Sequence, residues 1–537
     1  MTRLTSRRGR KLGSTQMRAT ASTSVLFSPR RLLIAAGLAA LVILVAAAIA
    51  SREFEPRVRQ AIVSRLSTSL EGAVELGGIR LSFFPLRFRA ESLIVRHHGR
   101  VDVPPLLMIQ SLVVDLNLLD LWGQVIDRVA IDGMELNIPP RPEAGGPRLP
   151  MTREHAGGGT PAVVIRHLTT TNTRIAVIPR ESGKNPKVWD LSSLDMRNIA
   201  TNAPASFTAS VTNPIPTGNI DITGNFGPWQ SGDPASTPLD GIYTFAADLG
   251  TIKGIEGHLD AKGEMDGVFD RITTHGDTTT ERFRIPRLNA GSLLLKTRYE
   301  AIVDGTKGDV ELTGVEIELG RSVLHAQGVV EGTKGIKGKR VTLKVTSDAV
   351  DLADLLTFVA STTPPAAHGT LVLDTAFDLP RGDGDVLDRL ALAGSFRADQ
   401  LGFTSPDTQQ QIDALSRSGQ GRPKDASIGD VASRVGGAFV LANGILTFKN
   451  LAFDVRGASI RMAGTYALES RAMNLSGEVR LVASASQTQT GFKSWVLKPF
   501  DPLFRNKGAG TLIAIHVRGT ADKPDIGLDV GKTLNPK

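Results

Sequence analysis

Residues Leu293 to Val303 read LLLKTRYEAIV and alternate between apolar and polar side chains with a period of two. One face of this segment carries Leu293, Leu295, Thr297, Tyr299, Ala301 and Val303. The other face carries Lys296, Arg298 and Glu300. Because successive side chains of a strand point to opposite faces, this pattern predicts a half-buried strand of an antiparallel sheet.

The same alternation recurs along most of the chain, for example in Ile460 to Leu468, IRMAGTYAL. Short polar or glycine-rich clusters at Asp304-Gly305, residues 332–338 and residues 469–471 predict turns between such segments. No regular alternation of strand and helix patterns is present, which argues against a parallel α/β fold. We expect a mainly β protein of about 25 strands, with a few short helices.

Two internal similarities indicate a repetitive architecture. Residues 126–140, IDRVAIDGMELNIPP, resemble residues 165–179, IRHLTTTNTRIAVIP, with their apolar positions in register. Residues 310–328 likewise resemble residues 446–464, and both segments change the parity of their apolar positions at the same place. One extra residue near Gly314 and near Asn450, a β-bulge, would return the apolar set to a single face.

The composition limits the classes of protein that the chain can belong to. It has 537 residues, 41% of them hydrophobic, and no cysteine, which excludes disulfides, thiolate metal sites and cysteine nucleophiles. Nine Arg or Lys residues precede the first acidic residue, Glu53, whereas the rest of the chain is close to neutral. A basic body that binds nucleic acid is therefore not expected.

An apolar run, LLIAAGLAALVILVAAAIA, extends from Leu32 to Ala50 and is long enough to cross a bilayer as a helix. The basic residues before it predict a cytoplasmic N-terminus, with the bulk of the chain on the far side of the membrane. The alternative is a cleaved signal peptide, because residues 48–50 resemble a cleavage site. The long basic segment and the length of the run favour an uncleaved, single-pass anchor.

Several other segments carry local signals. Val58, Ile62, Leu66 and Leu70 recur at helical spacing and predict a short amphipathic helix. Residues 139–161 are rich in Pro and Gly and predict a loop, and residues 409–416 predict a short helix. Residues 492–504 concentrate aromatic side chains and form either a cap over a sheet end or a patch that faces a membrane or partner.

We find no motif that indicates catalysis, a metal ion or a nucleotide. The nine histidines are scattered, and the adjacent His97 and His98 would point to opposite faces of a strand. Gly531-Lys532-Thr533 lacks the spacing and the following helix of a phosphate loop. We therefore expect no enzymatic activity, no cofactor and no metal, although sequence does not reveal whether distant carboxylates converge.

Several segments together resemble the AsmA family of bacterial envelope proteins, part of the bridge-like lipid-transfer superfamily that includes TamB. At the N-terminal end the resemblance lies in the apolar run, the short helix, Val74 to Ile79, Leu81 to Pro85 and Ile109 to Ile138. At the C-terminal end it lies in residues 415–421, 441–448, 457–458, 464–466 and 500–504, and in Val517 to Thr520 with Pro524. These motifs are mainly glycine and apolar positions.

The resemblance implies a periplasmic β-groove anchored in the inner membrane, which carries phospholipid toward the outer membrane and contributes to outer-membrane biogenesis. Its acyl chains would take the place of the second layer that normally covers an apolar sheet face. The resemblance also allows an envelope protein partner at the C-terminal end. A non-enzymatic scaffold that influences outer-membrane protein insertion or protein targeting to the membrane is the alternative role, and an envelope enzyme is a third.

The expected organisation has six parts: a basic arm (1–31), a transmembrane helix (32–50), an AsmA-like N-terminal region (51–138), a loop (139–161), a repeating β-groove (162–380) and an AsmA-like C-terminal region (381–537). The apolar faces of the repeated segments are the candidate lipid-binding residues: Leu293, Leu295, Val315, Ile317, Leu319, Phe448, Leu451, Phe453, Val455, Ile460 and Met462. The alternative is that these side chains pack against a second protein layer in a closed core.

Overall fold

The structure is a computed structural model of the whole chain. It describes residues 56, 59–64, 67, 72–83, 85–97, 104–117, 125–138, 164–177, 184–200, 202–230, 233–288, 291–359, 364–422, 431–482, 512–521 and 523–528. The chain divides into two units after Ala61, and the second unit contains the whole sheet.

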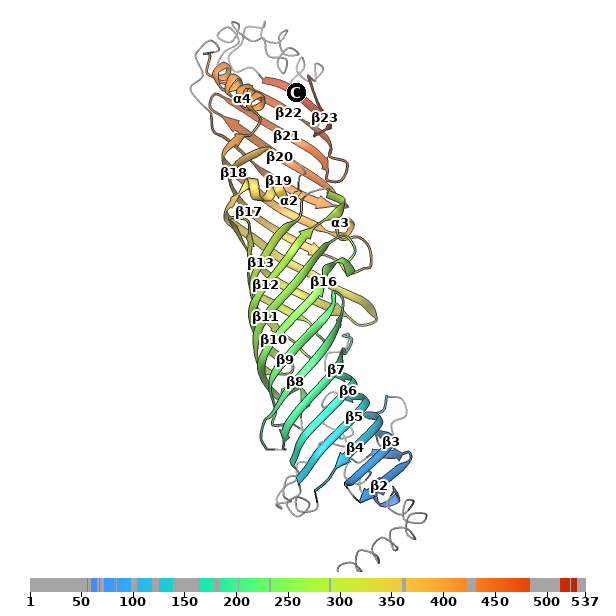
Figure 1. Cartoon of the computed structure of the whole chain (residues 1–537). Coiled ribbons are helices and arrows are strands. Elements are labelled where there is room, and N and C mark those ends of the chain that lie inside the picture. Colours follow the sequence, from blue (N-terminus) through green and yellow to red (C-terminus); the bar gives the residue numbers. More distant parts are fainter. Residues whose placement is uncertain are drawn as a thin grey trace, which may run out of the picture. The chain divides into compact units, whose positions relative to one another are not determined.

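The second unit is mainly β and consists of one curled sheet of 24 strands (Figure 1). The strands are β1 Gly72–Leu76, β2 Ile79–Phe83, β3 Leu86–His97, β4 Leu107–Asp115, β5 Val125–Ile138, β6 Val164–Val177, β7 Lys187–Ile199, β8 Ala205–Pro214, β9 Thr217–Phe226, β10 Pro238–Asp248, β11 Glu256–Val268, β12 Arg271–Arg284, β13 Leu293–Val303, β14 Val310–Leu319, β15 Ser322–Thr333, β16 Ile336–Asp351, β17 Ala367–Leu379, β18 Ala391–Phe403, β19 Ser433–Ala442, β20 Ile445–Val455, β21 Ala458–Ala467, β22 Ala472–Leu481, β23 Leu512–Thr520 and β24 Lys523–Leu528. Strands on both sides of residues 138, 162 and 380, the expected boundaries between regions, belong to the same sheet.

Strands β3 to β24 pair in chain order, and β1 and β2 both pair with β3. All of these pairs are antiparallel except β5 with β6, which is parallel and departs from the expected topology. Parallel neighbours need a crossover of about a dozen residues or more, and residues 139–163 supply that length. A tight hairpin turn cannot join strands that run in the same direction.

The parallel pair brings the two copies of the first repeat side by side. Ile126 pairs with Ile165, and Leu136 pairs with Ile175, so equivalent residues of the two copies are direct neighbours. The register of the sequence repeat is therefore also the register of the strand pair. The match lets both copies direct the same apolar set to one face of the sheet.

The two expected β-bulges are present. The pairing of β14 with β15 shifts between Leu312 and Val315, next to Gly314, and the pairing of β20 with β21 shifts between Phe448 and Leu451, next to Asn450. The side-chain amide oxygen of Asn450 accepts a hydrogen bond from the Ala438 amide at 2.8 Å. Each bulge keeps the apolar residues before and after it on the same face, as the change of parity predicts.

Helices are few and short in the part of the chain that the structure describes. Apart from the helical residues 59–64, they are α2 Leu352–Val359, α3 Val386–Arg389, α4 Pro406–Gly419 and the 3-10 turns η2 Pro234–Ser236, η3 Leu249–Thr251 and η4 Pro286–Leu288. Ser405 caps α4 by accepting a hydrogen bond from the Thr408 amide at 3.4 Å, and Pro406 occupies its first turn. This helix confirms and extends the one expected at residues 409–416.

The expected turns also lie where the strands end, at Asp304-Gly305, Lys334-Gly335 and residues 469–471. Residues 59–64 are helical, in agreement with the helix expected after the apolar run. The basic arm, the apolar run 32–50, the loop 139–161 and the aromatic segment 492–504 lie outside the described residues. Among the residues that are described, no helix is long and apolar enough to cross a membrane.

Two sets of long-range contacts show that the sheet curls. The first, here named the lysine seam, joins residues 184–189 to residues 304–309 and 331–339. The Lys187 amide donates to the Thr306 carbonyl at 2.8 Å, and the Gly335 amide donates to the side chain of Asn185 at 3.0 Å. These contacts bring the start of β7 to the ends of β13 to β16, although β8 to β12 lie between them in the ladder.

The second set, the arginine seam, centres on Arg287 in the turn between β12 and β13. Its guanidinium donates to Asp388 of α3 at 2.6 Å and to Glu469, between β21 and β22, at 2.7 Å. The connection between β10 and β11 also reaches α3, where the Val386 amide donates to the Lys253 carbonyl at 2.9 Å. Both seams join parts of the sheet that are distant in its ladder, which shows that the sheet curls toward its inner face.

Candidate functional site: an apolar groove with a lysine cluster

The inner face of the curled sheet contains an apolar pocket of about 350 Å³. Strands β5 to β12 and the loops between them supply its lining. All of the lining residues are hydrophobic: Met134, Leu136, Ile138, Leu168, Ile175, Trp189, Leu191, Leu194, Met196, Phe207, Ala209, Val211, Ile222, Phe226, Trp229, Leu239, Met265, Phe269 and Ile272. Such a volume lies in the range of about 300–1,000 Å³ that is typical of ligand sites.

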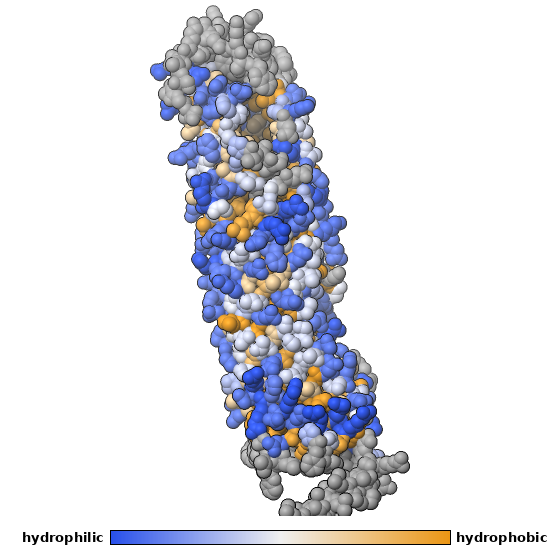
Figure 2. All heavy atoms as spheres, in the orientation of Figure 1, coloured by the Kyte–Doolittle hydropathy of each residue, from blue (hydrophilic) through white to orange (hydrophobic). Residues whose placement is uncertain are grey.

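Strand alternation places these side chains on one face. In β8, Phe207, Ala209 and Val211 point inward, whereas Ser206 and Thr208 between and beside them are exposed. Leu191, Ala209 and Val211 form a buried cluster with half-buried neighbours from β6, β7 and β9. Figure 2 shows hydrophobic residues among polar ones on the side of the molecule that faces the viewer.

The outer face is polar and carries ion pairs between strands. Arg340 of β16 pairs with Asp378 of β17 at 2.7 Å, and Arg434 of β19 pairs with Asp399 of β18 at 2.7 Å. Exposed pairs of this kind add little stability individually. Their main consequence is that the two faces of the sheet differ sharply in polarity.

Aromatic side chains surround the pocket. The rings of Trp189 and Phe269 are 6.4 Å apart, and those of Phe226 and Trp229 are 6.1 Å apart. The indole Nε1 of Trp189 donates to the Gly305 carbonyl at 3.0 Å. The indole Nε1 of Trp229 is buried without a hydrogen-bond partner in the described part of the chain. An oxygen-bearing ligand would satisfy this donor.

A band of hydroxyl groups crosses the inner face between β10 and β13. The Tyr243 hydroxyl is hydrogen-bonded to the Tyr299 hydroxyl and lies 2.8 Å from the Thr274 hydroxyl. Gly263 and Gly276 lie beside these rings, and a Cβ at either position would come within 2.8 Å of a tyrosine hydroxyl oxygen. The glycines therefore leave room for the tyrosines, and the lining of the groove is not apolar throughout.

Burial dominates the electrostatics of this band. It raises the pKa of Tyr299 above its ordinary value, and the hydrogen bond to Tyr243 adds to the shift. Both effects favour the protonated phenol. Tyr299 therefore stays neutral at physiological pH and keeps its hydrogen bond.

The lysine seam lies next to the apolar pocket. Asp309 is its central carboxylate, 3.0 Å from Lys184 and 3.7 Å from Lys339. Burial alone would raise the pKa of Asp309, but the Gly332 amide and the lysines outweigh it and hold the pKa below its usual value. Burial lowers the pKa of Lys187, whose ammonium lies 4.9 Å from the centroid of the Trp189 ring.

The predicted lipid-binding residues fall into two groups. The first occupies β13 and β14, where Leu295 pairs with Leu319 and Thr297 pairs with Ile317. Leu293, Leu295, Val315 and Ile317 are half-buried and Leu319 is buried, whereas Lys296 and Arg298 are exposed. The structure therefore brings the first group together on the inner face.

The second group occupies β20 and β21, separated from the first by β15 to β19. Phe448 lies 6.2 Å from Phe396, ring centroid to ring centroid, and Leu451 pairs with Met462. Val455, Phe453, Ile460 and Met462 belong to a core cluster with Ile412 and Leu415 of α4. At this end of the sheet a helix contributes to the cover of the apolar face, as the closed-core alternative supposes.

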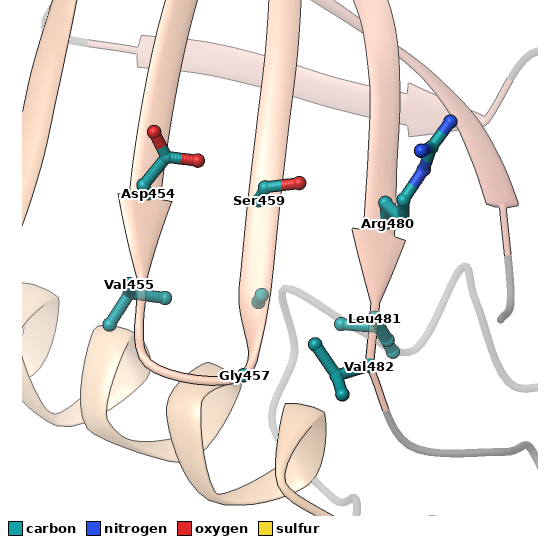
Figure 3. A pocket seen from close by; sticks show the side chains of 8 residues that line it. Asp454, Val455, Gly457, Ser459, Arg480, Leu481 and Val482 are labelled. Atoms are coloured by element: carbon teal, nitrogen blue, oxygen red, sulfur yellow. The ribbon is translucent and has the colours of Figure 1, made fainter.

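A second cleft of about 680 Å³ lies at the ends of β20 to β22. Asp454, Ser459 and Arg480 pair across the three strands, and Val455, Leu481 and Val482 lie toward the strand ends (Figure 3). Of the predicted lipid-binding residues, Val455 lines this cleft. The cleft mixes charged and apolar side chains, so it is less suited to an acyl chain than the pocket under β5 to β12.

None of the predicted lipid-binding residues lines the apolar pocket under β5 to β12. The signal for it was present in the sequence, because Ile220 and Ile222 of β9 and Phe207 and Val211 of β8 show the same period of two. Periodicity assigns these residues to a face but does not show which faces meet across the curl. The pocket therefore depends on contacts between residues that are distant in sequence.

The chain was compared with protein-family models, with curated proteins and with solved structures, and none of the three comparisons found a match.

Proposed function

We propose that the chain is a lipid-transfer protein of the AsmA type, anchored in the bacterial inner membrane, with its sheet in the periplasm, which moves phospholipid toward the outer membrane. The observation that carries this proposal is the fully apolar pocket on the inner face of a curled sheet. A ligand with acyl chains is the natural occupant, since each buried methylene contributes about 0.8 kcal/mol.

The polarity of the two faces supports the same role. Exposed Lys296 and Arg298 lie on the face opposite Leu295 and Ile317, so water solvates one face while lipid covers the other. The apolar run at residues 32–50 and the basic residues before it support the anchor and its orientation. The competing role, an assembly scaffold, requires no lipid in the groove.

Photo-crosslinking in cells tests the carrier role on two matched pairs of neighbouring residues. A photoreactive residue at Phe207 or Leu295, on the inner face, should capture phospholipid, whereas one at Thr208 or Lys296, on the outer face, should not. Mass spectrometry of the purified full-length protein should detect retained phospholipid. Equal capture from both faces, or none from either, would contradict the proposal and favour the scaffold.

The orientation is tested separately with reporter fusions. Alkaline phosphatase is active only outside the cytoplasm, so its fusion after Pro56 or after Lys537 should give an active enzyme. A C-terminal reporter that works only in the cytoplasm would overturn the orientation.

A further inference from the structure

One lysine of the seam lies on the inner face of the sheet. Lys187, Trp189 and Leu191 alternate along β7 and therefore share a face, and Trp189 and Leu191 line the apolar pocket. The Lys187 ammonium lies 4.9 Å from the Trp189 ring centroid. A positive charge thus lies beside a pocket whose lining residues are all hydrophobic.

Lys339 lies beside Lys187. A Cβ built on Gly308 would lie 3.0 Å from Lys187 Cδ and 3.2 Å from Lys339 Nζ, so the two lysine side chains meet at this glycine. The absence of a side chain at Gly308 leaves space between them.

The charged side chains that meet around Asp309 and Gly308 are not balanced. Four lysines, Lys184, Lys187, Lys307 and Lys339, accompany three carboxylates there, Asp304, Asp309 and Glu331, which leaves one positive charge in excess within this group. Within the described residues, no carboxylate oxygen lies within 4.0 Å of the Lys187 ammonium. The charge of Asp190 raises the pKa of Lys187, but its carboxylate forms an ion pair with Arg174 at 2.9 Å.

Burial makes this excess charge costly. It lowers the pKa of both Lys187 and Lys339; for Lys339 the opposing effect of Asp309 only partly offsets burial, and the positive charges of Lys187 and Lys184 add to the lowering. A bound anion would offset both effects, since an opposite charge nearby favours the charged form of a lysine. The geometry therefore suits an amphiphile whose anionic group reaches the lysines from the apolar pocket.

We propose that Lys187 and Lys339 bind the phosphate group of a phospholipid whose acyl chain occupies the apolar pocket under β5 to β12. The inference rests on the proposed lipid-transfer function and adds the chemistry of the headgroup. Two ammonium groups are well suited to a phosphate, and the Lys187 ammonium lies over the ring of Trp189, which lines the pocket.

The test uses the full-length protein in detergent and fluorescent lipids labelled at the end of one acyl chain. Phosphatidylglycerol and diacylglycerol with the same chains differ in the phosphate-containing headgroup, and inorganic phosphate serves as a competitor. The variants are Lys187→Gln, Lys339→Gln and Lys187→Arg, with Lys296→Gln on the outer face as the matched control. Circular dichroism checks that each variant is folded.

We expect phosphatidylglycerol to bind at least about tenfold more tightly than diacylglycerol. Lys187→Gln and Lys339→Gln should each remove most of that preference without weakening the binding of diacylglycerol. Lys187→Arg should retain the preference, and Lys296→Gln should leave both affinities unchanged. If Lys187→Gln fails to fold, the comparison of the two lipids on the unmodified protein and on Lys339→Gln still decides the question.

The possible failures are distinguishable. Equal affinities for the two lipids, unaffected by Lys187→Gln, would overturn the headgroup site and leave lipid transfer standing. Displacement by inorganic phosphate at concentrations comparable to those of the lipid would identify a free-phosphate site and overturn the inference. Binding of neither lipid would contradict the proposed function itself.

Discussion

At the scale of single residues, the hydroxyl band is the feature that alternation along one strand does not explain. Tyr243 and Tyr299 come from strands separated by β11 and β12, and they meet because Gly263 and Gly276 leave the inner face open between them. A side chain at either glycine would clash with a tyrosine. The identity of two glycines therefore determines where the groove carries polar groups.

The raised pKa of Tyr299 leads to a prediction about pH. The pKa of Tyr299 is higher in the folded state than in the unfolded state, where it is about 10. The protonated phenol therefore stabilises the fold fully below about pH 10, and this stabilisation is lost as the pH rises through the folded-state pKa. The chain has three tyrosines, so their ionisation can be followed by absorbance near 295 nm. We expect a late-ionising phase that disappears in Tyr299→Phe.

The same substitution changes stability at neutral pH. Tyr299→Phe removes a buried hydrogen bond and should lower the free energy of unfolding by about 1 kcal/mol, measured by urea denaturation. The difference between Tyr299→Phe and the unmodified protein should shrink above about pH 10. A difference that grows with pH would contradict this assignment.

At the scale of elements, the β-bulges keep the apolar residues of a strand on one face. Leu451, Phe453 and Val455 follow the bulge at Asn450 and share the inner face with Phe448, which precedes it. Phe448 and Leu451 are three residues apart, and a strand without a bulge would direct them to opposite faces of the sheet. A single residue thus couples the sequence pattern to the register of the strand.

Two variants of β20 test this role. Insertion of one alanine after Asn450 makes the spacing between Phe448 and Leu451 even, so a regular strand keeps the face but shifts the pairing of the following residues with β21 by two positions. The mismatched packing of Leu451, Phe453 and Val455 should cost several kcal/mol, at about 1.5–3 kcal/mol per side chain. Deletion of Asn450 preserves the face and loses mainly its hydrogen bond to Ala438, about 1 kcal/mol. Urea denaturation followed by circular dichroism distinguishes the two. Equal losses would show that the length of the bulge does not set the register of β20 on β21.

The two groups of predicted lipid-binding residues lie in different surroundings. Phe453 belongs to the cluster that includes Ile412 and Leu415 of α4, so the carboxylate of Phe453→Asp would be buried without a partner and should cost several kcal/mol. Ile317 is half-buried and belongs to neither the cluster under α4 nor the one that includes Leu355 of α2. Ile317→Asp should therefore fold and retain less lipid.

Thermal unfolding and lipid mass spectrometry measure these outcomes together, with Lys296→Asp on the outer face as the control. If Ile317→Asp unfolds as readily as Phe453→Asp, then a second layer also covers the inner face at β14. That result would support the closed-core alternative for both groups.

At the scale of the whole molecule, the two seams hold the curl. Arg287 joins the turn after β12 to α3 and to the turn after β21, whereas ordinary ion pairs of this sheet join neighbouring strands. Arg287 lowers the pKa of Glu469, so the stabilisation by this pair is present above the unfolded pKa of a glutamate and is lost as the pH falls.

Removal of this link should loosen the fold more than removal of an ordinary pair. Arg287→Met should lower the melting temperature by a few degrees and speed hydrogen exchange of the Leu390 amide, which donates to the Val386 carbonyl at the end of α3. Arg284→Met, which loses only the pair with Glu256 on the neighbouring strand, is the matched control. Similar effects of the two substitutions would show that the arginine seam adds nothing to the curl.

The mainly β class, the faces of the strands, the two bulges, the turns and the position of α4 follow from local patterns in the sequence. These features depend on side-chain periodicity and capping over a few neighbouring residues, which the chain carries locally. That β5 and β6 run parallel, that Lys187 lies beside an apolar pocket, and that α4 helps to cover the second predicted group became known from the folded structure alone. Each of these depends on which distant segments meet when the sheet curls, and period-two alternation is the same for an open, curled or covered sheet.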